Sequence, residues 1–410
     1  MASTKVYHRL NKRIFNLSVI PVRSIKTLFY HPRKSRCEDF CKLGSQYVFT
    51  SLRRPSYEAL FHEYSSRRKF YKEAARSTTA SSIYPSTWKP PSSGILSSLP
   101  ASWLPYAELM RVDKPTGTYY LFFPCIFSSL LAASIEVPHP LPTSVLGTSV
   151  LFLAGAFIMR GAGCSINDLW DRNLDTKVAR TRLRPIARGA LTPFKAFIFT
   201  GAQLLTGLSI LLQFPHQCLF YGIPSLLLVA TYPLAKRLTN YPQVVLGLTF
   251  SWGAIMGFPA LGVDLWNNST ALETAILLYL SNIAWTVLYD MIYAHMDVRD
   301  DAKAGIKSIV LRHEKHTKQI LSGLAIAQVG LLATAGLVSG SGPLYFIVSC
   351  GGTALSLTTM IKKVDLNNPR DCWWWFVNGC WITGGAISSG MAIDYLIKFW
   401  QNKQEKLGND

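Results

Sequence analysis

Three aspartates at helical spacing, Asp168, Asp171 and Asp175, follow Asn167 at the end of an apolar stretch of the sequence. At about 100° per residue, the four side chains fall within an arc of about 100° on one helix face. Like charges on such a face repel one another, and carboxylates near hydrocarbon are costly, so a cation should compensate them. A divalent metal ion would do this, and ion pairing with nearby basic residues is the alternative.

A second acidic motif contains Asp290, Asp297 and Asp301, flanked by Tyr293 and Asp300. On a continuous helix its three main carboxylates fall within about 40° of one another. Magnesium usually takes one or two protein carboxylates and completes its shell with water and phosphate oxygens. Two opposed acidic faces therefore favour a magnesium-diphosphate site over simple ion pairing.

Basic residues follow both motifs and occur in one further connection. They are Arg180 and Arg184 after the first motif, Lys303 and Lys307 after the second, and Lys236 and Arg237 between the two. Arginine can bind phosphate through two parallel hydrogen bonds, and lysine acts as a point charge. Such loops are also common on the positive side of membrane proteins. Beside two acidic motifs we interpret them as phosphate-binding.

Apolar stretches long enough to span a bilayer position these residues, and they predict an all-α, polytopic membrane protein. With 49% hydrophobic and 16% charged residues, the chain is unlike an ordinary soluble protein. Nine spans are expected, at 117–134, 145–166, 194–213, 217–235, 243–263, 271–292, 317–337, 342–361 and 373–397. The connections after every second span contain Lys and Arg, and those between them contain none. This alternation supports nine helices, with both acidic motifs on the positive side.

The basic charge is concentrated at the N-terminus, which argues against nucleic-acid binding. Residues 1–90 contain 18 Lys/Arg and 5 Asp/Glu, so they carry +13 of the net charge of +19. We expect a mitochondrial transit peptide and basic region at 1–76, although a basic arm that binds anionic lipid is the alternative. A Ser/Pro-rich linker at 77–101, a helical domain at 102–400 and a polar tail at 401–410 should follow.

Both acidic motifs resemble those of the UbiA superfamily of intramembrane aromatic prenyltransferases. The first matches N-D-x-x-D-x-x-x-D followed by R-T-x-x-R-P, and the second matches D-x-x-Y-A-x-x-D-x-x-D-D. The resemblance covers about residues 103–397. It implies a bundle of nine helices around a central cavity that is open to lipid.

The resemblance also implies a role for each candidate residue. Metal ligands would be Asp168, Asp171, Asp175, Asp290, Asp297 and Asp301. Diphosphate contacts would be Asn167, Arg180, Arg184, Lys303 and Lys307. Catalytic residues would be Asp290, Tyr293 and Asp297, and the cations for an aromatic carboxylate would be Arg237, Lys236 and Arg111.

The implied reaction is magnesium-dependent transfer of a polyprenyl chain to an aromatic ring. Lys236-Arg237 and Tyr293-Ala294 look most like members that prenylate 4-hydroxybenzoate, ortho to its hydroxyl, in ubiquinone biosynthesis. Expected partners are polyprenyl diphosphate, the aromatic acid, the bilayer and other enzymes of that pathway. The expected location is the mitochondrial inner membrane, with the active-site loops in the matrix. Alternatives are another acceptor, such as haem or homogentisate, or a membrane transporter.

Overall fold

A computed structural model describes residues 87–409, apart from 179–180, 299–300 and 302–306. The described residues belong to one compact unit, Arg68–Asp410. They form helices joined by turns and loops, without a strand in the ranges described, which confirms the all-α prediction. The expected transit peptide and basic region at 1–76 lie outside the described residues.

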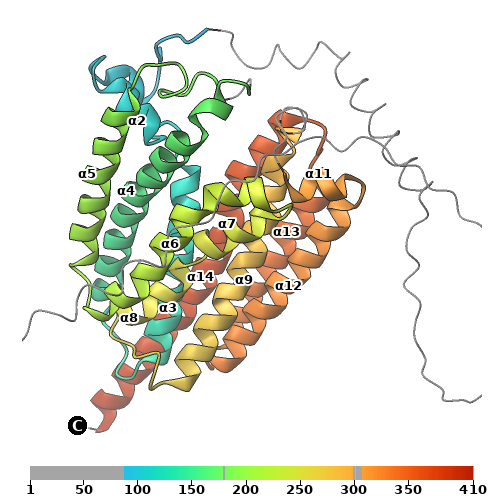
Figure 1. Cartoon of the computed structure of the whole chain (residues 1–410). Helices are drawn as coiled ribbons and strands as arrows, with labels where there is room; N and C mark the ends of the chain where they lie inside the picture. Colours follow the sequence, from blue (N-terminus) through green and yellow to red (C-terminus); the bar gives the residue numbers. More distant parts are fainter. Residues whose placement is uncertain (1–86, 179–180, 299–300, 302–306, 410) are drawn as a thin grey trace, which may run out of the picture. The chain divides into compact units, whose positions relative to one another are not determined.

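Helices occupy every expected spanning range (Figure 1). After a 3₁₀ turn η2 (Ile95–Ser98), they are α2 (Leu104–Leu109), α3 (Thr116–Ile135), α4 (Pro142–Asp175), α5 (Pro193–Leu211), α6 (Gln217–Leu238), α7 (Pro242–Phe250), α8 (Gly253–Ala260), α9 (Ser269–Ala294), α11 (Ile309–His313), η3 (Glu314–His316), α12 (Thr317–Val338), the π-helix η4 (Tyr345–Gly351), α13 (Gly352–Lys363) and α14 (Pro369–Asn409). Among the described residues, six helical segments are long and apolar enough to cross a membrane. The count of nine spans stays a prediction.

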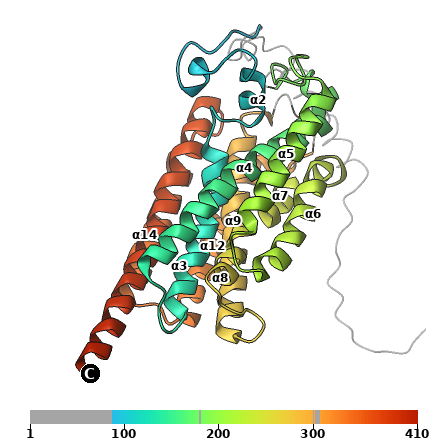
Figure 2. The ribbon, with the colours of Figure 1, turned by 90° about the vertical axis from the view of Figure 1, so that its left-hand side faces the viewer.

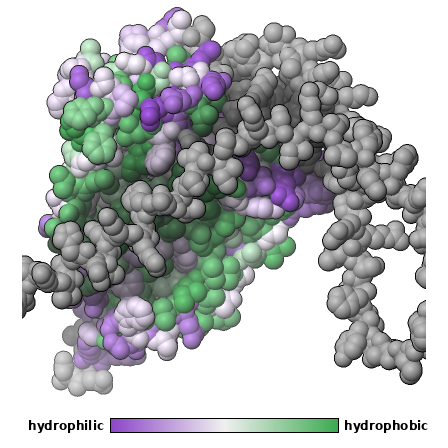
Figure 3. Space-filling view, in the orientation of Figure 1, coloured by the Kyte–Doolittle hydropathy of each residue, from purple (hydrophilic) through white to green (hydrophobic). Residues whose placement is uncertain are grey.

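The outer surface of the bundle is apolar where it would meet lipid. Figure 3 shows hydrophobic side chains over the middle of the visible face and hydrophilic ones gathered toward its ends. Phe197, Leu205, Phe220 and Leu227 of α5 and α6 are all more than half exposed. Large apolar side chains in this number have no reason to face water, so they fit a bilayer as the surrounding solvent.

Helices α3 and α9 form the interior of the bundle. Helix α3 packs against α4, α8 and α14, and α9 packs against α7 and α12. At their contact the Tyr120 and Tyr289 rings stack with centroids 3.6 Å apart, and Trp285 meets Tyr120 edge to face at 5.4 Å. All three rings are buried in the hydrophobic core of the bundle.

The expected span 243–263 is broken into α7 and α8 at Ser251 and Trp252. Helix α8 approaches α3 closely, because a Cβ on Gly257 would collide with the α3 backbone at Ser128 and Ser129. The Ser128 hydroxyl donates to the Gly253 carbonyl at 2.7 Å and accepts from the Gly257 amide at 3.0 Å. Both bonds tie Ser128 of α3 to the backbone of α8.

The last helix, α14, is much longer than its expected span. Its 41 residues correspond to about 60 Å, against about 30 Å for a bilayer's hydrocarbon. Figure 2 shows its C-terminal end projecting beyond the neighbouring helices. Residues 401–409, expected as a polar tail, continue this helix.

Candidate active site

Both acidic motifs face one large cavity. Its volume is about 2110 Å³, and its wall includes Asn167 and Asp168 of α4 together with Asp290 and Tyr293 of α9. Ordinary small-molecule pockets measure roughly 300–1,000 Å³. The cavity is therefore large enough for a long substrate, and it brings together motifs separated by more than a hundred residues.

The aspartates of the first motif share one buried face of α4, as their spacing predicts. Asp168, Asp171 and Asp175 are 1%, 8% and 6% exposed. Arg172, on the same turns, is exposed and donates to the Leu169 carbonyl at 2.8 Å. The carboxylates thus point into the protein, where their charge must be compensated.

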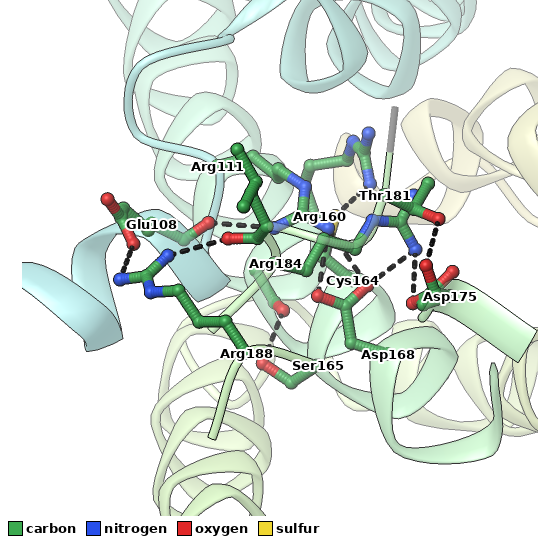
Figure 4. Close-up of polar contacts among 12 residues, drawn as sticks. Glu108, Arg111, Arg160, Cys164, Ser165, Asp168, Asp175, Thr181, Arg184 and Arg188 are labelled. Atoms are coloured by element: carbon green, nitrogen blue, oxygen red, sulfur yellow. Dashed lines mark hydrogen bonds and ion pairs between the residues drawn. The ribbon is translucent and has the colours of Figure 1, made fainter. Parts of the chain in front are cut away.

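Two arginines that lie outside α4 form ion pairs with this acidic face (Figure 4). Arg111 Nη2 lies 2.9 Å from both oxygens of Asp168. Arg184 Nη1 lies 3.0 Å from Asp168 Oδ1 and 2.9 Å from Asp175 Oδ2. Burial lowers the pKa of Arg111, but the attractions of Asp168, Cys164 and Asp113 together outweigh it and leave the pKa raised.

Arg111 reaches Asp168 from a backbone conformation that L-residues rarely adopt. Its φ is +61°, in the left-handed region. Its Nη1 donates to the Glu108 carbonyl at 2.8 Å, and its amide donates to the same oxygen at 3.1 Å. The left-handed residue follows α2, which is only six residues long.

The loop after α4 is folded so that Arg184 turns back onto that helix. Thr181 Oγ1 donates to the Asp175 carbonyl at 3.0 Å, and the Arg184 amide donates to the Thr181 carbonyl at 2.9 Å. Arg188 Nη2 lies 2.6 Å from Glu108 Oε2. The loop is thereby tied to both α4 and α2.

The second motif does not lie on one continuous helix, so the common face of its three carboxylates stays a prediction. Helix α9 ends at Ala294, and the amides of His295, Met296 and Asp297 each bond to the carbonyl three residues earlier. Asp297 is 6% exposed and accepts the amide of Asp301 on its carbonyl at 2.8 Å. The chain therefore leaves the regular α-helix between Asp290 and Asp297.

The oxygen donors fit a magnesium ion that shares its shell with a substrate. Asn167 Oδ1 is buried in the cavity wall and accepts no hydrogen bond from a described residue. Within the described ranges no three His, Cys, Asp or Glu side chains group closely enough to hold a metal by themselves. Magnesium needs few protein ligands when phosphate supplies the rest, so the donor set agrees with such an ion.

Among the remaining predicted cations, the structure describes the side chain of Lys307. Lys307 is exposed and lies outside the cavity-lining set of the described residues. Lys236 and Arg237 occupy the last turn of α6. Arg180, Lys303 and Asp300 lie outside the described residues. Tyr293 lines the cavity with its ring 4.7 Å from that of Phe376.

The structure adds Arg160, which the sequence analysis did not select. Arg160 lies in α4 two turns before Asn167 and lines the cavity. It contacts Cys164 Sγ, and its buried Nε has no hydrogen-bond acceptor among the described residues. A Cβ on Gly117 would collide with its guanidinium. A single arginine inside an apolar span is a functional signal in itself, and it could have been found on that ground.

A helical membrane bundle with two acidic motifs around one cavity defines an intramembrane transferase of prenyl groups. Residues 121–383 match the UbiA prenyltransferase family, and the chain belongs to this family. A relative from Saccharomyces cerevisiae, named 4-hydroxybenzoate polyprenyltransferase, mitochondrial, is 47% identical over 74% of this chain and 80% of its own length. The Homo sapiens relative of the same name is 42% identical over 77% of this chain and 81% of its own length.

Solved structures of the family show the same fold. A UbiA homologue from Aeropyrum pernix K1 aligns with a TM-score of 0.54 at 20% identity, over 68% of this chain and 97% of that one. A UbiA homologue from Archaeoglobus fulgidus, solved with DMAPP and Mg²⁺, aligns with a TM-score of 0.52 at 16% identity, over 72% and 98% of the two chains.

Proposed function

We propose that this protein transfers a polyprenyl group from polyprenyl diphosphate to 4-hydroxybenzoate, at the ring carbon ortho to the hydroxyl, in ubiquinone biosynthesis. The observation that carries the proposal is the single cavity lined by both Asp168 and Asp290. The relatives that cover most of the chain are named for this acceptor.

The apolar part of the cavity suits the polyprenyl chain. Leu205, Leu208 and Ile223 line the cavity and are also 67%, 42% and 52% exposed. These side chains therefore belong both to the cavity wall and to the surface that would contact lipid. A hydrocarbon tail lying along α5 and α6 would be buried partly by protein and partly by the bilayer.

The polar end of the cavity suits the diphosphate. Asp168, Asp171, Asp175, Asp290, Asp297 and Asp301 are the proposed magnesium ligands, with Asn167 beside them. When bound, magnesium supplies positive charge that stabilises the departing diphosphate. Arg184 and Arg111 already lie against Asp168 and can donate to phosphate oxygens from the same place. Arg180, Lys303 and Lys307 are proposed as further contacts.

The reaction proper breaks the allylic carbon–oxygen bond and forms a carbon–carbon bond to the ring. Diphosphate leaves with the bonding electron pair, the ring carbon attacks the allylic cation, and the ring then loses a proton. Asp290 and Tyr293 line the cavity and are proposed to stabilise the cation. Asp297 is proposed as a further catalytic residue. Aromatic faces attract cations, which suits Tyr293 to this role.

A cation must meet the carboxylate of the aromatic acid. Arg237, Lys236 and Arg111 remain the candidates from the sequence, and Arg111 is paired with Asp168 in this structure. We add Arg160, because it lines the cavity and its Nε is a buried donor without an acceptor in the described part of the chain. Arginine binds carboxylates in a planar, two-bond geometry that would also orient the ring.

The same relatives and the apolar helices support a mitochondrial membrane protein. We propose the inner membrane, with the acidic motifs on the matrix side and with room for association with other enzymes of the pathway. The basic, acid-poor sequence of residues 1–37 supports mitochondrial import.

The activity is tested with membranes that contain the full chain, magnesium, a polyprenyl diphosphate and a panel of aromatic acids. Mass spectrometry should find a prenylated 4-hydroxybenzoate and no comparable product from homogentisate. A preferred acceptor other than 4-hydroxybenzoate would overturn the assignment of substrate, and diphosphate left intact under all conditions would overturn the reaction itself.

A further inference from the structure

Three side chains at the polar end of the cavity contact one another in a closed triangle, which we call the latch: Trp88, Glu108 and Arg188. Trp88 Nε1 donates to Glu108 Oε1 at 3.0 Å. Arg188 Nη2 lies 2.6 Å from the other oxygen of Glu108. The Arg188 guanidinium carbon lies 4.5 Å from the centroid of the Trp88 ring, within the range of a cation–π contact.

The latch joins three segments that are far apart in the sequence. Trp88 precedes η2, Glu108 lies in α2, and Arg188 lies in the loop after α4 (Figure 4 shows the latter two). All three residues line the cavity, as do Pro90–Leu96. Leu96 is buried at 6% exposure and anchors the far end of this segment.

Residues 88–96 therefore form one wall of the cavity at the end where the acidic motifs lie. Apart from Leu96, most of this segment is exposed, so it lies at the surface as well as against the cavity. The side chains of Glu108 and Arg188 are only 15% and 14% exposed. The Coulomb attraction in an ion pair shielded from water in this way is stronger than in a fully hydrated pair.

The latch is also coupled to the two arginines that pair with Asp168. The Glu108 carbonyl accepts from Arg111 Nη1 at 2.8 Å, and Arg188 Nη1 donates to the Leu183 carbonyl at 2.7 Å, next to Arg184. Glu108 and Arg188 thus contact Trp88 of the cavity wall, and they also bond to Arg111 and to the backbone beside Arg184. They are positioning residues, since none of them pairs with the acidic motifs directly.

We propose that Trp88, Glu108 and Arg188 hold residues 88–96 as a cover over the water-facing end of the cavity, and that this cover keeps water from the allylic cation. The inference rests on the proposed function. Water would capture the cation as polyprenol, so an enzyme of this kind must exclude it. The cover comes from a segment before the family-matched residues 121–383.

The test uses the full chain in lipid nanodiscs, with Glu108→Gln, Arg188→Gln and Trp88→Ala. The control is Trp103→Ala, because Trp103 is a 67% exposed tryptophan of the same region that lies outside the cavity-lining residues described. Hydrogen exchange reports opening of residues 88–98. The ratio of polyprenol to prenylated acid, measured with magnesium and both substrates, reports water capture.

Each latch variant should speed exchange of this segment and raise the polyprenol ratio by about two- to five-fold. This corresponds to losing one modest ion pair in the Glu108 and Arg188 variants, and a cation–π contact of similar strength in the Trp88 variant. Trp103→Ala should change neither. Unchanged exchange in all three variants would overturn the latch. Faster exchange with an unchanged product ratio would overturn its role in excluding water. If the wild-type protein forms neither product, the proposed function fails, while the exchange data still decide whether the latch exists.

Discussion

Arg184 Nη1 bridges Asp168 Oδ1 and Asp175 Oδ2, at 3.0 and 2.9 Å, across two turns of α4. A single guanidinium nitrogen therefore contacts two carboxylate side chains that are 1% and 9% exposed. Arg111, which precedes α4 in the chain, also contacts Asp168. The two arginines together compensate the negative charge of the buried acidic face. The same contact places a phosphate-binding side chain beside the proposed metal ligands.

Replacing Arg184 by Ala should lower both stability and activity, because two buried carboxylates lose a charged donor. We expect a loss of about 1.5–3 kcal/mol in the free energy of unfolding. Arg184→Lys keeps the charge but not the fork, so it should recover stability more than activity. Thermal unfolding in detergent and kcat/KM for polyprenyl diphosphate measure the two effects. Equal recovery of both by lysine would contradict a specific role in binding diphosphate.

Asp171→Asn and Asp297→Asn should each reduce magnesium-dependent transfer by about 100-fold or more, as removal of a central electrostatic contact does. Both side chains are buried, at 8% and 6% exposure, and asparagine preserves their size. Membrane insertion should remain normal, which protease protection of the loops can establish. Full activity in either variant would remove that residue from the proposed metal site.

The cation that holds the aromatic acid can be identified by comparing Arg160→Gln with Arg237→Ala. Loss of the correct residue should raise KM for the acid by about 10- to 100-fold, as expected for a charged hydrogen bond, while KM for the diphosphate changes little. A residue whose variant weakens both substrates equally does not hold the carboxylate. Steady-state kinetics with each substrate varied in turn gives the answer.

Gly257→Ala should destabilise the bundle by about 1–3 kcal/mol, since its new Cβ would meet the α3 backbone. Gly330→Ala in α12 is the matched control, because no described atom lies within 4 Å of the Cβ that it would add. That change should be neutral or stabilising by about 0.5–1 kcal/mol. Thermal unfolding midpoints compare them. Similar midpoints for the two variants would show that the α3–α8 contact can relax.

The sequence predicted the features that depend on local pattern. Apolar ranges located the helices, and the spacing of Asp168, Asp171 and Asp175 placed them on one face, which the structure confirms. The family was also identified from the two motifs, and the match over residues 121–383 confirms it. These predictions succeed because helical periodicity and the cost of charge near hydrocarbon act within a few turns.

Features that depend on distant contacts were not predicted. Helix α8 is tied to Ser128 of α3, which lies 125 positions before Gly253 in the chain. The pairing of Arg111 with Asp168 joins residues 57 positions apart, and no local sequence pattern predicts it. The helical spacing of the aspartates continues to Asp301, but α9 ends at Ala294, and the spacing alone does not predict this end. The individual roles assigned to the site residues remain predictions.

The left-handed backbone of Arg111 lowers local stability, but the arginine side chain is needed at this position to pair with Asp168. Glycine would adopt φ +61° without penalty, whereas an L-residue pays about 1–2 kcal/mol there. Glycine at position 111 would therefore relieve the backbone strain, but it would remove one of the arginines that pair with Asp168. A stabilised variant selected only for a higher melting temperature could accept that exchange and lose its catalytic rate. Screens for thermostable forms of this protein should hold position 111 fixed.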